Sequence, residues 1–346
     1  MTLSSPTKVR EIRRDAEFVD EFAAISHFKR KNRVRPYEGR YANYVRSVSW
    51  NCDGTMLAGG NYDSSHSHVV VGQMDPSTNR LRHQFLGSGH DDFVNEVAFS
   101  PVDPFIVASC SSDRSVRVWD VRVTKTHHRC VTSDGNTALT WSPDGKNIVF
   151  IDKSDRLHVI DRANLDVKAR YEFKEKIYDV TFHPSQKFLI VCGTAGKIDI
   201  LRFPELTHYR TIQAHPPLSD CLAAEISPNG QYLAIGASDA SCSIWDLEDM
   251  ICVRTLSRMD YPVRSVSFSH CSNLVASGSE DYTIDISWAE KNIRVGEVNI
   301  PNECYSLQWN PRAYLLAYAT APQNERDRDP ITFRVFGYPA GSRRDD

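Results

Sequence analysis

The sequence has few of the features that mark secreted, membrane-spanning or metal-stabilised proteins. Nine cysteines are scattered singly among its 346 residues, with no C-x-x-C pair to indicate zinc or a redox motif. There is also no secretory signal, no Asn-x-Ser/Thr site and no apolar run near the roughly 18 residues of a membrane helix. We therefore expect free, mostly buried thiols, a reducing compartment and no membrane contact.

A large charge of either sign is missing too. The 41 Lys and Arg residues nearly balance the 44 Asp and Glu residues, which gives a formal net charge of −3. This balance provides no electrostatic footprint for binding phosphates, so we expect this chain to meet RNA only indirectly. Basic character is confined to residues 1–40, where ten Lys and Arg stand against six Asp and Glu.

Motifs that carry catalytic chemistry are absent from the sequence. No Gly-rich phosphate loop, G-x-S-x-G elbow or H-E-x-x-H motif occurs. His66 and His68 would share one face of a strand, but no third ligand stands nearby, which favours a polar stretch over a metal site. We expect no catalytic, cofactor-binding or metal-binding residues. A pocket with converging carboxylates of strongly perturbed pKa would revive an enzyme as an alternative.

An internal repeat is the strongest positive feature of the sequence. Seven segments share a period-2 apolar strand that ends in a polar turn, with the anchor residues Trp50, Phe99, Trp141, Phe182, Ile226, Phe268 and Trp309. Successive anchors are 49, 42, 41, 44, 42 and 41 residues apart. Because a WD-repeat blade takes roughly 40–45 residues, this spacing predicts an all-β fold, a seven-bladed β-propeller.

The second repeat carries the full WD pattern. His90 stands before the anchor, and Ser109, Asp113 and Trp119 follow it. The resemblance to WD repeats implies a hydrogen-bonded tetrad, in which Asp113 orients His90 and His90 links through Ser109 to the indole N–H of Trp119. Such a chain satisfies buried polar groups, so we interpret His90 and Asp113 as structural and not as a catalytic dyad.

Other repeats depart from this pattern. The fifth keeps His215, Asp239 and Trp245 but has Ile235 at the serine position, so we expect its hydrogen-bond chain to be incomplete. The sixth has Ser287 where the tryptophan would stand. The fold itself is still expected, because the period and the apolar alternation persist.

The ring must be closed by a strand from the N-terminal part of the chain. The seventh repeat has three predicted strands, and an open blade would expose a sheet edge, so we expect residues 31–37, KNRVRPY, to supply the fourth. We therefore assign residues 1–30 to an N-terminal arm, 31–341 to the propeller and 342–346 to a C-terminal tail.

The arm itself has two features. Residues 6–28 carry apolar side chains three or four apart and predict a short amphipathic helix, which packs either under the propeller or on a partner. The basic run 29–35 is interpreted as part of the closing strand in preference to a nuclear localisation signal, although the two roles are compatible before folding.

Several stretches go beyond what a WD repeat needs. They are IDILRFPELTHYRTIQAHP (198–216), CVRTLSRMDYPVRSVSFSH (252–270), SGSEDYTIDI (277–286) and, more weakly, EFAAISHFKRKNRVRP (21–36). Over most of residues 17–340 the chain resembles the subunit 3 family of the THO complex, the WD-repeat subunits of the THO/TREX messenger-RNA export machinery. The resemblance implies a nuclear, non-catalytic scaffold that couples transcription to messenger-RNA processing and export. The partners it implies are large helical THO subunits and, through the complex, an export helicase and its adaptors.

A second function class is kept open by a short motif. Trp119-Asp120-Val121-Arg122 fits the W-D-x-R pattern of WD-repeat substrate receptors for cullin-type ubiquitin ligases. Co-purification with a ligase adaptor would favour that alternative, whereas co-purification with large helical nuclear subunits would favour the THO interpretation.

One loop is a candidate partner contact. Arg258, Asp260 and Tyr261 lie between the last predicted strand of the fifth repeat and the first of the sixth, where Pro262 stiffens the chain. The repeat does not require these residues, and Tyr and Arg dominate the energetics of protein interfaces. We therefore predict that the three residues bind a partner and do not belong to the core.

Overall fold

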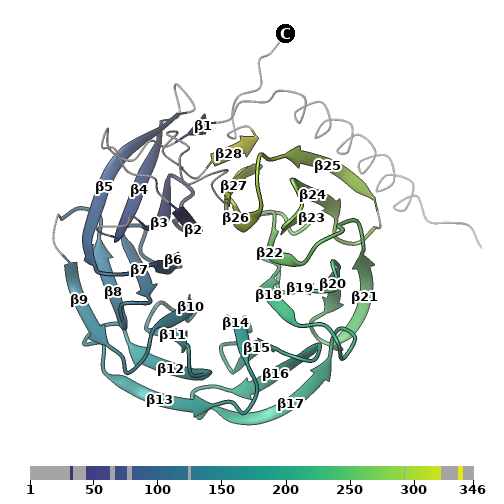
Figure 1. The fold of residues 1–346 in the computed structure, drawn as a ribbon, viewed down its shortest axis with the longest axis horizontal. Coiled ribbons are helices and arrows are strands. Elements are labelled where there is room, and N and C mark those ends of the chain that lie inside the picture. Colours follow the sequence, from purple (N-terminus) through teal and green to yellow (C-terminus); the bar gives the residue numbers. More distant parts are fainter. Residues whose placement is uncertain are drawn as a thin grey trace, which may run out of the picture.

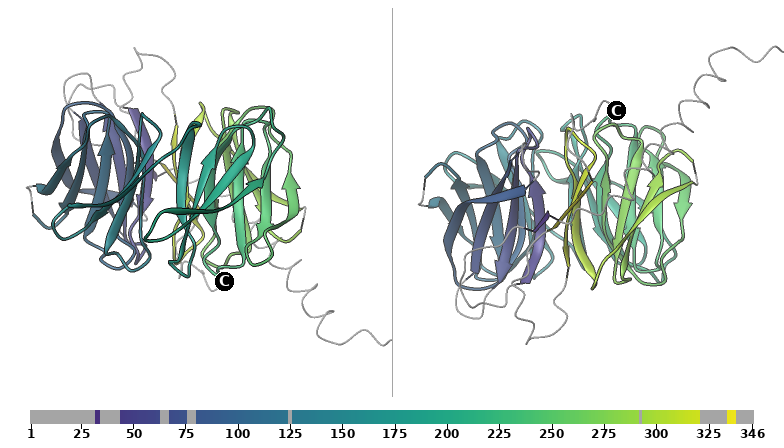
Figure 2. Two further views of the ribbon diagram at one scale, coloured as in Figure 1. Left: turned by 90° about the horizontal axis from the view of Figure 1, so that it is seen from below. Right: turned by 90° about the horizontal axis from the view of Figure 1, so that it is seen from above.

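The structure, a computed structural model, describes residues 32–33, 44–62, 67–75, 80–123, 126–291, 293–320 and 334–337. Seven antiparallel four-stranded sheets stand around a central axis like the blades of a propeller (Figure 1). Views from the edge show the strands running between the two faces of the ring (Figure 2). The predicted all-β, seven-bladed propeller is confirmed. The predicted arm helix lies outside the described residues.

Each blade uses one repeat, and its strands follow one another from the central channel to the rim. From the channel outwards the strands are β2 (Tyr44–Trp50), β3 (Met56–Tyr62), β4 (Ser67–Asp75) and β5 (Arg80–His90) in blade one; β6 (Val94–Phe99), β7 (Ile106–Ser111), β8 (Ser115–Asp120) and β9 (Thr126–Val131) in blade two; β10 (Asn136–Trp141), β11 (Asn147–Asp152), β12 (Arg156–Asp161) and β13 (Val167–Glu172) in blade three; β14 (Ile177–Phe182), β15 (Phe188–Gly193), β16 (Lys197–Arg202) and β17 (Thr207–Gln213) in blade four; β18 (Cys221–Ile226), β19 (Tyr232–Ala237), β20 (Cys242–Asp246) and β21 (Ile251–Leu256) in blade five; β22 (Val263–Phe268), β23 (Leu274–Ser279), β24 (Thr283–Trp288) and β25 (Arg294–Asn299) in blade six; and β26 (Cys304–Trp309), β27 (Leu315–Thr320), β28 (Arg334–Gly337) and β1 (Asn32–Arg33) in blade seven.

The core consists of seven apolar clusters, one between each pair of neighbouring blades. Successive residues of a strand point to opposite faces of its sheet, so one strand contributes to two clusters. In β19, Leu233 and Ile235 face blade four, whereas Ala234 faces blade six. Middle strands are therefore apolar on both faces, and β7, β23 and β27 are buried along their whole length.

Blade seven joins the two ends of the described chain. β1 pairs antiparallel with β28, with Asn32 opposite Val335 and Arg33 opposite Arg334. This pairing places an N-terminal segment as the outer strand of the blade that contains Trp309 (Figure 1). The rest of the strand predicted over 31–37 lies outside the described residues, as do the whole predicted arm, residues 1–30, and the tail 342–346.

Antiparallel order sorts the loops onto two faces of the ring. Loops that join an outer strand to the next blade, and loops between second and third strands, lie on one face, which we call the upper face. The turns between first and second strands and between third and fourth strands lie on the opposite, lower face. Among the described residues no helix is long and apolar enough to cross a membrane.

Candidate functional site

The four polar residues predicted as a tetrad in the second repeat lie in one chain of hydrogen bonds, to which His90 comes from the end of β5 and the others from blade two. His90 Nδ1 is 2.8 Å from Asp113 Oδ2, and His90 Nε2 is 2.8 Å from Ser109 Oγ. The indole N–H of Trp119 donates to the same Ser109 Oγ over 2.8 Å. Gly89 permits this arrangement, because its φ of 143° suits glycine and an added Cβ would lie 2.6 Å from Arg117.

The electrostatics of this chain favour a neutral imidazole. Burial lowers the pKa of His90 despite the Asp113 carboxylate beside it. Burial alone would raise the pKa of Asp113, but the His90 and Ser115 hydrogen bonds hold it well below its ordinary value. The Nδ1–H of His90 therefore donates to Asp113, and Ser109 donates to Nε2. The side chains of His90 and Asp113 are 0 % and 3 % exposed, so a substrate cannot reach this pair.

Blade five also has a complete chain, so the prediction of a missing hydroxyl is wrong. Ser243 Oγ lies 2.8 Å from His215 Nε2 and accepts the indole N–H of Trp245 over 2.8 Å. His215 Nδ1 is 3.0 Å from Asp239 Oδ2. Ser243 lies directly across the β19–β20 pair from Ile235. The hydroxyl is thus supplied by β20 and not by β19, and it bonds a histidine and a tryptophan as Ser109 does in blade two.

In blade six a serine stands in place of the tryptophan, and an arginine from a loop contacts this serine. Ser287 occupies the tryptophan position, since it lies opposite Val275 just as Trp245 lies opposite Leu233. Arg258 donates to Ser287 Oγ over 3.2 Å, and Ser287 donates to Asp285 Oδ2 over 2.5 Å. The guanidinium of Arg258 thus reaches into a buried part of the blade.

Blade three contains a polar cluster that the sequence analysis missed. His158 Nε2 is 2.8 Å from Asp152 Oδ2, and Arg156 Nε is 2.9 Å from the same oxygen. The imidazole of His158 stacks on Phe150 with ring centroids 4.7 Å apart. A histidine and a carboxylate thus recur inside a blade, but in a different order along the chain, which the WD pattern does not anticipate.

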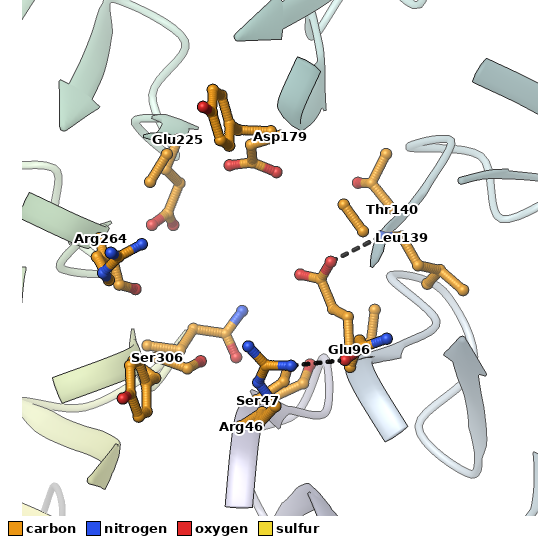
Figure 3. A pocket seen from close by; sticks show the side chains of 18 of the residues that line it. Arg46, Ser47, Glu96, Leu139, Thr140, Asp179, Glu225, Arg264 and Ser306 are labelled. Carbon is orange, nitrogen blue, oxygen red and sulfur yellow. Dashed lines mark hydrogen bonds between the residues drawn. The ribbon is translucent and has the colours of Figure 1, made fainter. Parts of the chain in front are cut away.

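The central channel holds a cavity of about 360 Å³ lined by all seven innermost strands. Figure 3 shows the carboxylates of Glu96, Asp179 and Glu225 pointing into it. Burial, followed by the charge of Asp179, raises the pKa of Glu96, and burial also raises the pKa of Asp179 itself. Burial raises the pKa of Glu225 to about 8. These are converging carboxylates of the kind that would suggest an enzyme.

The contacts of these carboxylates indicate a different role. At six of the seven blade junctions, a polar side chain on the innermost strand of one blade accepts a backbone N–H from the innermost strand of the following blade. The pairs are Ser47 with Val97, Ser49 with Phe99, Glu96 with Leu139, Asp179 with Ala224, Glu225 with Phe268, Ser265 with Leu307, Ser267 with Trp309, Ser306 with Val48, and Gln308 with Trp50. The side chains therefore satisfy backbone groups on strand edges that face the channel.

The chemistry of the channel follows from this arrangement. Glu96 accepts the Leu139 N–H over 2.6 Å and Asp179 accepts the Ala224 N–H over 2.9 Å. Both carboxylates are therefore already hydrogen-bonded to the backbone of the following blade. No cluster of three or more metal-ligating side chains occurs in the part of the chain that the structure describes. We therefore assign Glu96, Asp179 and Glu225 to the cohesion of neighbouring blades.

The predicted partner loop lies on the upper face. Asp260 and Tyr261 are exposed, with Tyr261 at 55 %. Arg258 is half-buried and bound to Ser287, so it holds the loop from below. The structure thus brings Asp260 and Tyr261 to the surface and directs Arg258 inward. Partner binding by the three residues stays a prediction.

Comparison with known proteins identifies the repeats and the family. The family model "WD domain, G-beta repeat" matches residues 80–120, 206–246 and 250–286. The chain is 32% identical over 305 residues to THO complex subunit 3 of Arabidopsis thaliana, across 88% of this chain and 95% of that protein. The chain belongs to the THO complex subunit 3 family.

Two other similar proteins extend the comparison. The chain is 32% identical over 316 residues to WD repeat-containing protein AAC3 of Dictyostelium discoideum, across 84% of this chain and 64% of that protein. The β-propeller domain of Cps50 (Swd1) from Myceliophteria thermophila superposes with a TM-score of 0.75 at 14% identity, covering 90% of this chain and 100% of that domain. At this identity the second match shows the fold alone.

Each matched segment of this THO subunit 3 family member runs from the outer strand of one blade to the third strand of the next. The matches over 80–120 and 206–246 contain the two complete chains, which end at Trp119 and Trp245. The match over 250–286 stops one residue before Ser287, the position from which the tryptophan is missing. Two of the three matched segments thus contain a complete polar chain.

Proposed function

We propose that this chain is a non-catalytic scaffold subunit of a THO complex, which couples transcription to messenger-RNA processing and nuclear export. The observation that carries the proposal is the 32% identity with THO complex subunit 3, which extends over 95% of that protein. The seven-bladed ring supports it, because a rigid propeller offers loops on two faces and strands on its rim for several partners at once.

The lack of catalytic activity is supported by where the candidate residues lie. The His90–Asp113 pair is buried in blade two and linked to Trp119 through Ser109. The channel carboxylates accept backbone N–H groups of the neighbouring blade. A catalytic base must reach a proton of its substrate, and these groups are already bound within the fold.

The proposed partners are the other THO subunits, the large helical ones first. The export helicase and adaptors join through the complex, RNA is met indirectly, and the location is the nucleus. We propose the loop with Arg258, Asp260 and Tyr261 as one contact, with Tyr261 and Asp260 facing the partner and Arg258 fixing the loop. A tyrosine held on a stiff loop loses little entropy on binding.

A cullin-ligase substrate receptor is the alternative. In its W-D-x-R motif, Arg122 forms a bidentate ion pair with Asp120 through Nε and Nη2, at 2.8 and 2.6 Å. The Arg122 guanidinium also lies over the Phe105 ring at 4.9 Å. These contacts stabilise the lower face of blade two and account for the motif without a ligase.

Affinity purification separates the two functions. The tagged chain is purified from nuclear extract of its own organism, with and without ribonuclease, and the bound proteins are identified by mass spectrometry. A folded Arg122→Ala variant is purified in parallel. The proposal expects large helical THO subunits in all samples, unchanged by ribonuclease. Recovery of a cullin adaptor that the Arg122→Ala change abolishes, without THO subunits, would establish the alternative.

A further inference from the structure

Two exposed tyrosines lie close together on the upper face of blade six. Tyr261 is 55 % exposed and Tyr282 is 66 % exposed, although both are large aromatic side chains. The loops that carry them are joined by Asp281, whose Oδ2 accepts the backbone N–H groups of Asp260 over 2.9 Å and Tyr261 over 3.3 Å. Tyr282 follows Asp281 directly, so the two tyrosines belong to one surface, which we call the tyrosine rim.

The tyrosine rim is held in place before any partner binds. Ser279 Oγ donates to Asp281 Oδ2 over 2.9 Å, and Arg258 connects the 257–262 loop to buried Ser287. Pro262 restricts the chain directly after Tyr261. Side chains on a loop fixed from both ends lose less conformational entropy on binding, which favours a docking surface.

The charge around the tyrosine rim is negative. The five upper-face loops of this sector, residues 214–220, 238–241, 257–262, 280–282 and 300–303, contain the carboxylates Asp220, Asp239, Asp260, Glu280, Asp281 and Glu303. The same five loops contain one lysine or arginine, Arg258, whose guanidinium is hydrogen-bonded to Ser287 inside the blade. The neighbouring cation on β22, Arg264, is paired with Glu280 at 2.5 Å. With Glu280 and Arg264 neutralising each other, five carboxylates remain against the one guanidinium of Arg258, so the sector is negative and attracts positive charge.

Aromatic faces and negative charge together favour one kind of ligand. Guanidinium groups bind over tyrosine rings, and arginine combines this with bidentate pairing to carboxylates. The molecule itself uses the same contact elsewhere, since the Arg202 guanidinium lies over the Tyr209 ring at 4.7 Å.

We propose that the tyrosine rim, with Asp260, is the docking site for an arginine-rich segment of a partner protein. The inference rests on the proposed scaffold function, because it assigns the chemistry of one partner. Arginine side chains stack on Tyr261 and Tyr282, and the carboxylates of the sector orient the segment along the upper face.

The first test measures direct binding to the purified full-length chain. The probe is a short fluorescein-labelled peptide in which arginine alternates with serine, and its lysine and glutamate counterparts are measured by anisotropy under the same conditions. We expect the arginine peptide to bind most tightly, the lysine peptide more weakly and the glutamate peptide not at all. Equal binding of the arginine and glutamate peptides would overturn the proposal.

Variants then locate the site. Tyr261→Ala combined with Tyr282→Ala is expected to weaken binding of the arginine peptide about tenfold. The matched control is Tyr209→Ala, which removes a tyrosine of 51 % exposure from the outer strand of blade four. We expect this control to bind the arginine peptide as tightly as the wild-type chain. Unchanged affinity in the folded double variant would overturn the proposal.

A charge reversal keeps the test decisive if the double variant folds poorly. Asp260→Lys changes one exposed side chain on the upper face and is expected to reduce arginine-peptide binding at least as much. Asp249→Lys makes the same change on an exposed turn of the lower face of blade five and is expected to have little effect. Equal losses in the two charge reversals would show a diffuse electrostatic effect and contradict the site.

The inference and the proposed function fail in distinguishable ways. If THO subunits co-purify with wild-type chain but the arginine peptide does not bind, the tyrosine rim is wrong and the scaffold function stands. If the peptide binds the tyrosine rim but THO subunits do not co-purify, the docking site stands and the THO assignment is wrong.

Discussion

The hydroxyl of Ser243 provides the sharpest test of the polar chain in blade five. Ser243→Ala leaves two buried groups without partners, the indole N–H of Trp245 and Nε2 of His215. An unsatisfied buried polar group costs about 1–3 kcal/mol, so the expected loss of unfolding free energy is about 2–4 kcal/mol. Trp245 is only 7 % exposed, which limits rescue by water.

A control two residues earlier isolates the effect. Ser241 donates to Asp239 Oδ1 over 2.7 Å, but the Asp239 side chain is 24 % exposed and still receives His215 on its other oxygen. Ser241→Ala is therefore expected to cost less than about 1 kcal/mol. Both variants are measured by urea unfolding at constant m-value. A Ser243→Ala variant as stable as the Ser241→Ala control would refute the reasoning.

Three further predictions concern the tetrad, the channel and the ring closure. Trp119→Ala is expected to lower the unfolding free energy by about 3–5 kcal/mol in urea titrations, because it removes a buried aromatic and a partner of Ser109; an unchanged midpoint would contradict its burial. Burial raises the pKa of Glu225 from 4.5 to about 8, so the folded state retains a proton that the unfolded chain releases, and stability falls as pH rises from 4.5 towards 8. Glu225→Gln should remove part of this slope and be roughly 1 kcal/mol more stable than wild type near pH 8, since the half-buried side chain moderates the effect; parallel pH profiles would contradict this. Deleting residues 1–38 removes β1 and exposes the edge of β28, so thermal melts should show a lower midpoint and aggregation, whereas a stable, soluble deletion variant would disprove the closure.

The repeat spacing is enough to predict the fold. Anchors about every 42 residues and apolar alternation determine blade number and strand order, because each junction buries the same kind of cluster. Position along the repeat also places His90 and Trp119 together. These features depend on sequence distance alone, which is why they can be seen without coordinates.

Features that depend on cross-strand register were harder to predict. Ile235 and Ser243 face each other only because β19 and β20 pair in that register, so a pattern read along one strand finds no hydroxyl. Arg258 reaches Ser287 from 29 positions away, and no repeat pattern specifies such a contact.

The hydrogen bonds between innermost strands correspond to a pattern in the sequence. Ser265 and Ser267 in VRSVSF, and Ser306 and Gln308 in CYSLQW, stand two apart on the innermost strands. Polar side chains at alternate positions of a strand that faces a channel indicate partners across the blade junction. Acidic residues on the innermost strands, such as Glu96, follow the same pattern, with a carboxylate in place of the hydroxyl.

Reconstitution tests the central claim of a THO scaffold most directly. The purified full-length chain is mixed with the large helical THO subunits of its own organism, treated with nuclease and measured by size-exclusion chromatography and mass photometry. A stoichiometric complex that contains the chain, survives nuclease treatment and is weakened by the folded Tyr261→Ala, Tyr282→Ala variant is the predicted result. Elution of the wild-type chain alone, well separated from the THO subunits, would contradict the claim.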